Sequence, residues 1–510
     1  MANFKENNIS PCNSSNSSGS TYPAHTMDCQ QRQELAIEGL ARTESIIQLA
    51  EKNQVSREFI YNQMKKADGA LEKQFNQPSK DDKVLYWIPV TKEWLDSVVM
   101  SLLLNCHSPY RGVISFFADN LDESISLGKI NNIANKAVVQ AREVNDAEDL
   151  SNIREGSHDE LFQGGMPVLA GIDLDSLYCY LLACEEQRDA ETWAIHLWDK
   201  EEQGLAPELI IADAGKGLRA GQALAWPDVS CEGDHFHAFH LLFRLSSTLD
   251  RQAYAAIENT NKLELRMEKA KKKCKGNTLS KKLATAYKKE EKAVRLADDV
   301  RVLVNWVHND ILILNGTDAD IRKELYDIVV ELLGELIPLC EYRIKPVWRA
   351  LSNQRDDLLA FAYRLDQQFN ELSQEFQVSI ELVRQMLNLL HISPETQAYW
   401  YEASKLHKKF GSKFFYIQQK VIHLIDHFHR TSSMVENFNS RLRTYFFLRR
   451  QIGSAFLDLL RFFLNHTSFM RSEHQERQGK SPAEMLNGQP HPHWLEMLGF
   501  KLFRKEKTAA

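Results

Sequence analysis

The sequence predicts a multidomain, helix-rich protein whose α/β core is interrupted by a large all-helical insertion and preceded by further helical segments. Short apolar runs at 168–172 and 209–212 have the length and composition of buried strands. Residues 246–425 are almost wholly helical in pattern, which is far too long for a connection within one sheet. A chain of 510 residues is long enough for several domains.

The overall composition is that of an ordinary globular protein. The net charge is −7, so nucleic-acid binding would have to come from local basic patches. The eight cysteines form no CxxC pair, which favours a reduced intracellular compartment over a disulfide-stabilised fold. We expect no secretory signal and no membrane span, because the first residues lack an apolar segment and later apolar runs are short.

The N-terminal part predicts a DNA-binding helix pair. Residues 1–30 are rich in Asn and Ser, which is typical of a disordered tail. Within residues 31–80, a helical pattern is followed by a short break and by Ser56, which can cap a second helix. This order is that of a helix-turn-helix, although a plain helical hairpin with a charged face has the same pattern. The basic residues of the second helix that could contact DNA are Arg57, Lys65 and Lys66.

A second helical unit is expected over residues 84–150. An amphipathic helix ends near Leu121, and Ser126 can cap the next one. This unit could be another DNA-binding helix-turn-helix, a dimerisation element or a packing element of the core, and of these we favour the helix-turn-helix.

Two aspartates follow the apolar strands of the predicted core, residues 160–245. Asp173 comes after the first apolar run and Asp213 after the second. Ligands of open α/β sheets bind just beyond the carboxyl ends of the strands. Neighbouring carboxylates repel each other unless a hard cation such as Mg²⁺ lies between them. Taken alone, Asp173 is better explained as a hairpin turn residue, although Asp175 fits that role better, and Asp213 is better explained as a helix N-cap.

A third acid opens a late helix within residues 426–475. Ser433 and Glu436 form the S-x-x-E pattern of a capping box, which requires no catalysis. The same helix places Glu436 in line with Arg443, and a carboxylate beside arginines suits a site for metal and phosphate. An ordinary salt-bridged surface has this pattern too. The candidate phosphate contacts here are Arg441, Arg443, Arg449 and Arg450.

Residues 231–240 carry possible metal donors at intervals of three. A structural zinc site would need four well-spaced ligands, so we favour another role for Asp234 and His237. Asp234 and His237 would then not bind the metal themselves; they would orient a metal ligand through a hydrogen bond, or contact DNA. Histidines packed into the core are the plainest alternative. The Gly-Lys-Gly at 215–217 does not match a phosphate-binding loop.

Four of these motifs, in this order, resemble prokaryotic insertion-sequence transposases of the DDE superfamily. They are the run from Gly171 to Asp173, IIADAGKGLRAG around Asp213, GDHFH at 233–237, and SSMVENFNSRLRTYFFLRR around Glu436. The likeness extends over roughly residues 108–500 and includes SPYRGVISFFAD and GKSPAEMLNGQPHPHWLEMLGF. Little room remains for a further strand between Tyr178 and Asp213, so the sheet topology stays open.

The resemblance implies an RNase H-like core that is interrupted at 246–425, completed by residues 426–475 and followed by a tail at 476–510. It implies that Asp173, Asp213 and Glu436 are the catalytic acids and hold two Mg²⁺ (or Mn²⁺) ions.

The implied reaction is metal-dependent cleavage of DNA at transposon ends, followed by attack of the freed 3′-OH on target DNA. Partners would be the terminal inverted repeats, target DNA and further copies of the chain, in the cytoplasm at the nucleoid. Lys216 and the basic stretch 262–295 would add phosphate contacts. Three alternatives remain: an inactive or domesticated descendant that binds DNA, a nuclease that does not join strands, and a helical regulator whose acids are caps and turns.

Overall fold

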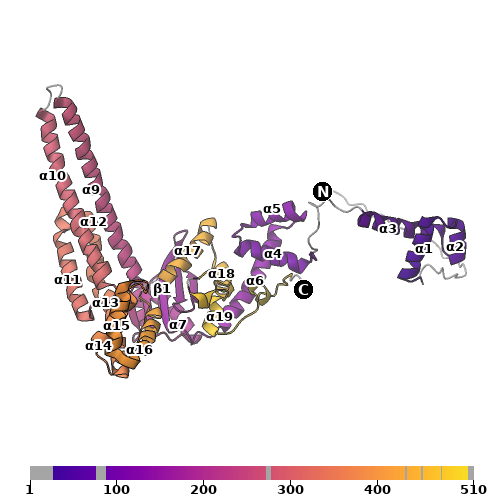
Figure 1. Cartoon of the computed structure of the whole chain (residues 1–510). Helices are drawn as coiled ribbons and strands as arrows, with labels where there is room; N and C mark the ends of the chain where they lie inside the picture. Colours follow the sequence, from indigo (N-terminus) through magenta and orange to yellow (C-terminus); the bar gives the residue numbers. More distant parts are fainter. Residues whose placement is uncertain are drawn as a thin grey trace. The chain divides into compact units, whose positions relative to one another are not determined.

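The computed structural model describes residues 27–75, 88–271, 277–430, 433–449, 452–472 and 474–503. The chain divides into two compact units, Met1–Pro89 and Val90–Ala510. Among the described residues, no helix has the length and apolar character needed to cross a membrane. Figure 1 shows the elements of both units.

The first unit is a three-helix module. It contains α1 (Cys29–Ala41), α2 (Ile46–Asn53) and α3 (Arg57–Phe75), which enclose a small core of Leu35, Leu49, Val55 and Ile60. The Ser56 hydroxyl accepts a hydrogen bond from the Phe59 N–H (3.1 Å), so the predicted cap is present. The predicted tail is slightly too long, because α1 begins at Cys29; residues 1–26 lie outside the described part.

The second unit begins with three helices that pack onto the core. They are α4 (Lys92–Leu104), α5 (Tyr110–Leu121) and α6 (Leu127–Ala147). The Ser126 hydroxyl caps α6 by accepting from the Lys129 N–H. These helices share one hydrophobic cluster with the sheet and with α18 (Ser454–His466). Of the roles that the sequence left open for this segment, packing is the one these contacts support.

A mixed five-stranded sheet forms the centre of the second unit, in the order β3-β2-β1-β4-β5. The strands are β1 (Glu155–Gln163), β2 (Met166–Asp173), β3 (Cys179–Cys184), β4 (Leu209–Ala212) and β5 (Ser230–Gly233). The predicted hairpin is confirmed, because β2 and β3 pair antiparallel. β2 also pairs antiparallel with β1, whereas β1, β4 and β5 run parallel to one another. The core therefore begins at β1, earlier than the predicted residue 160.

Helices cover both faces of the sheet. On one face α7 (Ala190–Glu202) and α8 (Lys216–Ala225) pack around Trp193 and Tyr180. On the other face, α6, α17 (Ser433–Leu448) and α18 pack against Leu161 and Val168.

The predicted helical insertion is present and starts directly after β5. Its first two helices, α9 (His235–Lys271) and α10 (Asn277–Trp306), form a long antiparallel pair, the arm (Figure 1). A short π-helix, Val307–Ile311, ends the arm. The remaining helices are α11 (Ala319–Glu335), α12 (Glu341–Asn353), α13 (Arg355–Phe376), α14 (Ile380–Leu390), α15 (Gln397–Phe410) and α16 (Phe414–Asp426). They share a hydrophobic core with the base of the arm.

Short elements complete the described chain. The 3₁₀ turns are Ile337–Leu339, Gly411–Lys413 and Gln475–Arg477, and the last helices are α19 (Pro482–Asn487) and α20 (Trp494–Met497). The predicted C-terminal tail at 476–510 is partly structured, because Trp494 and Leu495 are buried in the same cluster as α17 and α18.

Candidate metal centre

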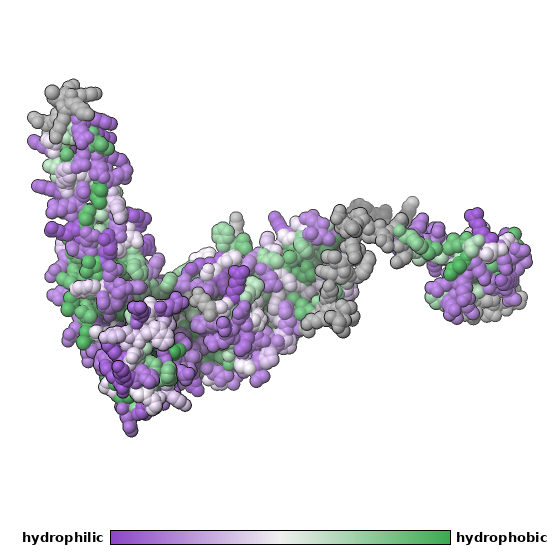
Figure 2. Space-filling model, viewed as in Figure 1, coloured by the Kyte–Doolittle hydropathy of each residue, from purple (hydrophilic) through white to green (hydrophobic). Residues whose placement is uncertain are grey.

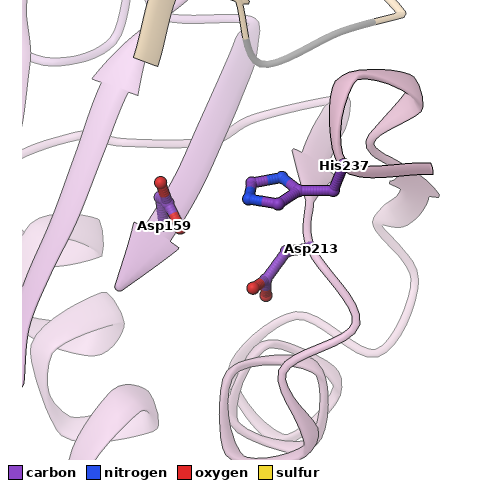
Figure 3. A group of neighbouring side chains, drawn as sticks. All are labelled: Asp159, Asp213 and His237. Atoms are coloured by element: carbon purple, nitrogen blue, oxygen red, sulfur yellow. The ribbon is translucent and has the colours of Figure 1, made fainter. Parts of the chain in front are cut away.

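Three side chains from different elements converge at one edge of the sheet. They are Asp159 of β1, Asp213 directly after β4, and His237 of α9, and one ligand atom of each lies within 4.8 Å of the others (Figure 3). Two carboxylates and an imidazole at this separation could hold a metal ion.

The strand register brings the two aspartates together. β1 and β4 are parallel neighbours, and His158 pairs with Ala212. The next residue on each strand is Asp159 and Asp213, so both acids lie at the same edge of the sheet. Asp159 is buried and Asp213 is half-buried.

Asp159 is held by two donors. The Asn439 side-chain amide of α17 donates to Oδ2 (2.5 Å), and the Glu160 N–H donates to Oδ1 (2.7 Å). The pKa of Asp159 is raised to about 6, mainly by burial and to a smaller extent by the negative charges of Asp213 and Glu436, which outweigh the opposing effects of the Glu160 N–H and His237. A divalent cation bound among these carboxylates would offset their mutual repulsion, so the charges at the site favour a metal ion.

Asp213 also holds the turn that leads into α8. The Gly215 N–H donates to its Oδ1 (2.8 Å), and the Arg219 side chain donates to its backbone carbonyl (2.8 Å). A Cβ at Gly215 would lie 2.9 Å from Asp213 Oδ1, so a larger residue there would displace the Asp213 carboxylate from this position.

His237 is oriented by Asp234. Asp234 Oδ2 lies 2.5 Å from His237 Nδ1, and Asp234 also accepts the Phe236 N–H at the start of α9 (3.0 Å). The hydrogen bond to Asp234 is the main reason why the pKa of His237 is raised to about 9. Because Nδ1 is engaged, Nε2 is the atom directed at the acids. The sequence predicted that both His237 and Asp234 would support the metal ligands. The structure places His237 among the possible ligands themselves, and Asp234 keeps the supporting role by orienting the His237 ring.

Glu436 lies at the margin of this cluster. It is in the first turn of α17, 3.9 Å from His237 Nε2 and 3.4 Å from Arg443 Nη1. The sequence prediction that Glu436 and Arg443 share a helix face is confirmed. α17 begins at Ser433, whose side chain is outside the described part, so the predicted capping box lies outside the described residues.

Asp173 is not part of this cluster, and its predicted place in the site is wrong. β2 runs antiparallel to β1 and β4, so the carboxyl end of β2 lies at the opposite edge of the sheet, where Asp173 pairs with Gly156. Gly156 is three residues from Asp159, so Asp173 also faces the other side of the sheet. There Asp173 shapes a turn: it accepts from the Ser176 N–H (2.7 Å) and from the Ser176 hydroxyl.

Sequence reasoning missed Asp159, although a pattern could have revealed it. Gly164 and Gly165, both with positive φ, form a two-residue turn between β1 and β2. A Gly-Gly pair between two strand-like segments indicates a hairpin. That hairpin would have shown β2 running back toward the opposite edge and placed Asp159 inside the preceding strand.

The other predicted phosphate contacts are distributed unevenly. Lys216 is exposed at the first residue of α8, and Arg443 is exposed beside Glu436. Arg441 and Arg449 are half-buried, and burial lowers the pKa of both; Arg449 also stacks over Phe456 (4.0 Å). Arg57, Lys65 and Lys66 are exposed on α3 of the first unit. Arg450 lies outside the described residues.

Within the described part of the chain, the possible metal cluster includes neither Cys231 nor His240. Burial raises the pKa of the Cys231 thiol to about 11, which disfavours the thiolate that zinc would bind. The spacing at 231–240 therefore does not assemble a zinc site around Cys231. In comparisons with known proteins, no family model and no curated protein matches this chain.

Proposed function

We propose that the protein is a DDE transposase that cuts DNA at transposon ends and joins the freed 3′ ends to target DNA. The observation that carries the proposal is the position of Asp159 on β1 beside Asp213, directly after the parallel neighbour β4, with Glu436 close to them on a late helix. The resemblance to DDE transposases implies this arrangement: two acids on a sheet and a third on a helix after the insertion. In the proposal Asp159 takes the place that the sequence assigned to Asp173.

The donors suit the proposed ions. Asp159, Asp213 and Glu436 offer the carboxylate oxygens that Mg²⁺ or Mn²⁺ prefers, and His237 offers one nitrogen once a cation among these acids displaces the ring proton that they favour. Two bound ions would polarise the scissile phosphate and lower the pKa of the attacking water.

The remaining side chains position these ligands. Asn439 fixes the carboxylate of Asp159, and Asp234 fixes the ring of His237. Arg443 is exposed beside Glu436, where it is placed to contact a phosphate of the DNA. No Ser or Tyr nucleophile is required, because both steps are in-line phosphoryl transfers. The mixed sheet with helices on both faces agrees with an RNase H-like core.

DNA binding is proposed for surfaces outside the metal centre. The α2–turn–α3 segment would recognise the inverted repeats through Arg57, Lys65 and Lys66, which are exposed on the second helix. Transposases act on paired ends, so the active form would be an assembly of copies at the nucleoid.

A coupled cleavage and strand-transfer assay tests the proposal. Its substrates are the DNA ends that flank the coding sequence, with Mg²⁺, Mn²⁺ or EDTA. Wild type should release and join 3′ ends only with a divalent ion, and Asp159→Ala and Asp213→Ala should abolish both steps while DNA binding remains. Cleavage without joining would support a nuclease instead. Tight binding without cleavage under any ion would indicate an inactive descendant.

A further inference from the structure

The α15–α16 pair exposes large aromatic side chains that the proposed catalytic centre does not use. Trp400 and Tyr401 on α15 are 65% and 64% exposed, and Phe415 and Tyr416 on α16 are 64% and 68% exposed. Such side chains are usually at least half covered in a folded protein, so four of them within 17 residues indicate a binding surface. We call these four residues, with His407, the aromatic surface.

These aromatic residues are not needed to pack the two helices together. The buried stripe of α15 consists of Ala403, Leu406 and Phe410, and that of α16 consists of Phe414, Ile417 and Val421. Both stripes belong to the hydrophobic core of the helical insertion. The exposed rings lie outside these stripes, so the fold of the insertion does not explain them.

Part of the surface forms a row of rings. Trp400 and His407 are seven residues apart on α15, so they lie on the same side of the helix about two turns apart. The His407 ring is 5.9 Å from the Phe415 ring of α16, in an edge-on contact. The rings of Trp400, His407 and Phe415 therefore form a row that runs from α15 to α16.

The surface is also basic. Residues 397–420 contain five lysines, at 405, 408, 409, 413 and 420, and one acid, Glu402. Two of these lysines are paired: Lys405 with Glu402 (2.9 Å), where it also lies over the Tyr401 ring (4.0 Å), and Lys420 with Glu375 of α13 (3.8 Å). Lys408 is exposed, and it makes no ion pair within the described part of the chain.

We propose that the aromatic surface binds single-stranded nucleic acid, with unpaired bases stacked on Trp400 and Phe415 and phosphates near the lysines. Exposed rings interleaved with basic residues are the combination by which proteins bind single strands. Protein interfaces are also aromatic, but lysine is depleted in them, whereas here lysines outnumber acids five to one. The bases of a duplex are stacked on one another and cannot stack on Trp400 or Phe415. A duplex would therefore contact the lysines through its phosphates and would not contact the rings.

The test measures binding of a short oligothymidylate to the full chain in EDTA, with Asp213→Ala present in every variant. Because no cleavage can occur, the result is independent of the proposed transposase activity. Stacking of one base on one ring is worth about 1–3 kcal/mol, which is roughly 5- to 150-fold in Kd. Trp400→Ala with Phe415→Ala should therefore weaken binding at least about 20-fold, with no change in Tm because both rings are exposed.

The matched control is Tyr254→Ala on the arm, which removes a similarly exposed ring (70%) near the middle of α9. It should leave the oligothymidylate affinity unchanged. A duplex of the same length should bind the double variant as well as it binds the parent. The proposal is overturned if the parent does not bind oligothymidylate, if the control loses as much affinity as the double variant, or if duplex binding falls equally. Self-association that only the double variant loses would overturn it as well, in favour of an interface between copies.

Discussion

Asn439 is the residue that most directly controls the geometry of Asp159. It is fully buried, its amide nitrogen donates to Asp159 Oδ2, and its amide oxygen has no hydrogen-bond partner among the described residues. Asn439 lies one turn after Glu436 on α17. Its hydrogen bond therefore fixes the distance between this helix and the Asp159 carboxylate on β1.

Asn439→Ala should weaken divalent-ion binding about 10- to 100-fold, because the loss of a residue that orients a metal ligand has effects of this size. The measurement is a titration of Mn²⁺ against the rise in Tm. The matched control is Asn437→Ala, which alters an exposed asparagine on the same helix. Equal ion affinity in wild type and Asn439→Ala would show that Asp159 needs no such support.

Asp173 is the residue at which stability and catalysis can be separated. Burial raises its pKa from 3.8 to about 6. The folded state therefore binds the proton more tightly than the unfolded state, so the charged carboxylate destabilises the fold above pH 6. This penalty disappears as the pH falls from about 6 to below 4.

Asp173→Asn should accordingly stabilise the protein at pH 8, by at most about 3 kcal/mol for a shift of two pKa units. The amide oxygen can still accept from Ser176. Thermal unfolding across pH 4–8 should show that the variant has a higher Tm than wild type at pH 8 and that this difference in Tm disappears near pH 4. Metal-dependent cleavage should survive this change. A complete loss of cleavage, with the fold intact, would return Asp173 to the catalytic site.

At the scale of elements, sequence patterns located the helices and the hairpin more reliably than the site. Ser56 and Ser126 cap helices as predicted, and β2 and β3 pair as predicted, because caps and hairpins depend on neighbouring residues. Asp213 was predicted at the site because it follows a buried strand, and it belongs to the possible metal cluster. Glu436 was predicted because it opens an amphipathic helix, and it lies 3.9 Å from His237 of that cluster. Asp173 was chosen wrongly because the direction of β2 depends on its pairing with β1, which the order of apolar runs does not reveal.

The packing of α8 on α7 and on the residues just before it depends on two glycines, Gly217 and Gly221. A Cβ at Gly217 would lie 1.9 Å from the Arg188 carbonyl oxygen, and one at Gly221 would lie 2.4 Å from Trp193 Cβ. The helices can therefore approach closely only where these side chains are absent. Because α8 follows the turn that Asp213 holds, this contact also supports the metal centre.

Gly221→Ala should lower the free energy of unfolding by about 1–3 kcal/mol, since backbone and a packed Cβ would have to move. It should also weaken ion binding by shifting Asp213. Gly128→Ala in α6 is the matched control: its Cβ would meet only Ser126 Oγ at 3.9 Å, so the change should be neutral or stabilise the helix by up to about 1 kcal/mol. Thermal unfolding with and without Mn²⁺ measures both effects. Equal Tm values for the two variants would contradict the close packing of α7 on α8.

At the scale of the whole molecule, charge is segregated. The sequence from 262 to 295, which includes the last part of α9 and the first part of α10, contains thirteen Lys and Arg against four acids, although the net charge of the whole chain is −7. Hydrophilic residues make up most of the arm's surface in the view of Figure 2. Lys262 and Arg295 pair with glutamates on their own helices, but Lys281, Lys282, Lys288 and Lys289 are exposed and form no ion pair with the described residues.

These four lysines are expected to contact DNA phosphates without sequence preference. Each phosphate contact releases condensed counterions, so the logarithm of affinity falls with the logarithm of salt concentration by about 0.9 per contact. Replacing all four lysines by glutamine should therefore weaken duplex binding and reduce this slope by up to about 3.6, while helix propensity changes little. Replacing them by arginine keeps the charge and should preserve both affinity and slope. An unchanged slope in the glutamine variant would mean that the arm's charge serves solubility, and that the phosphate contacts lie nearer to Lys216 and Arg443.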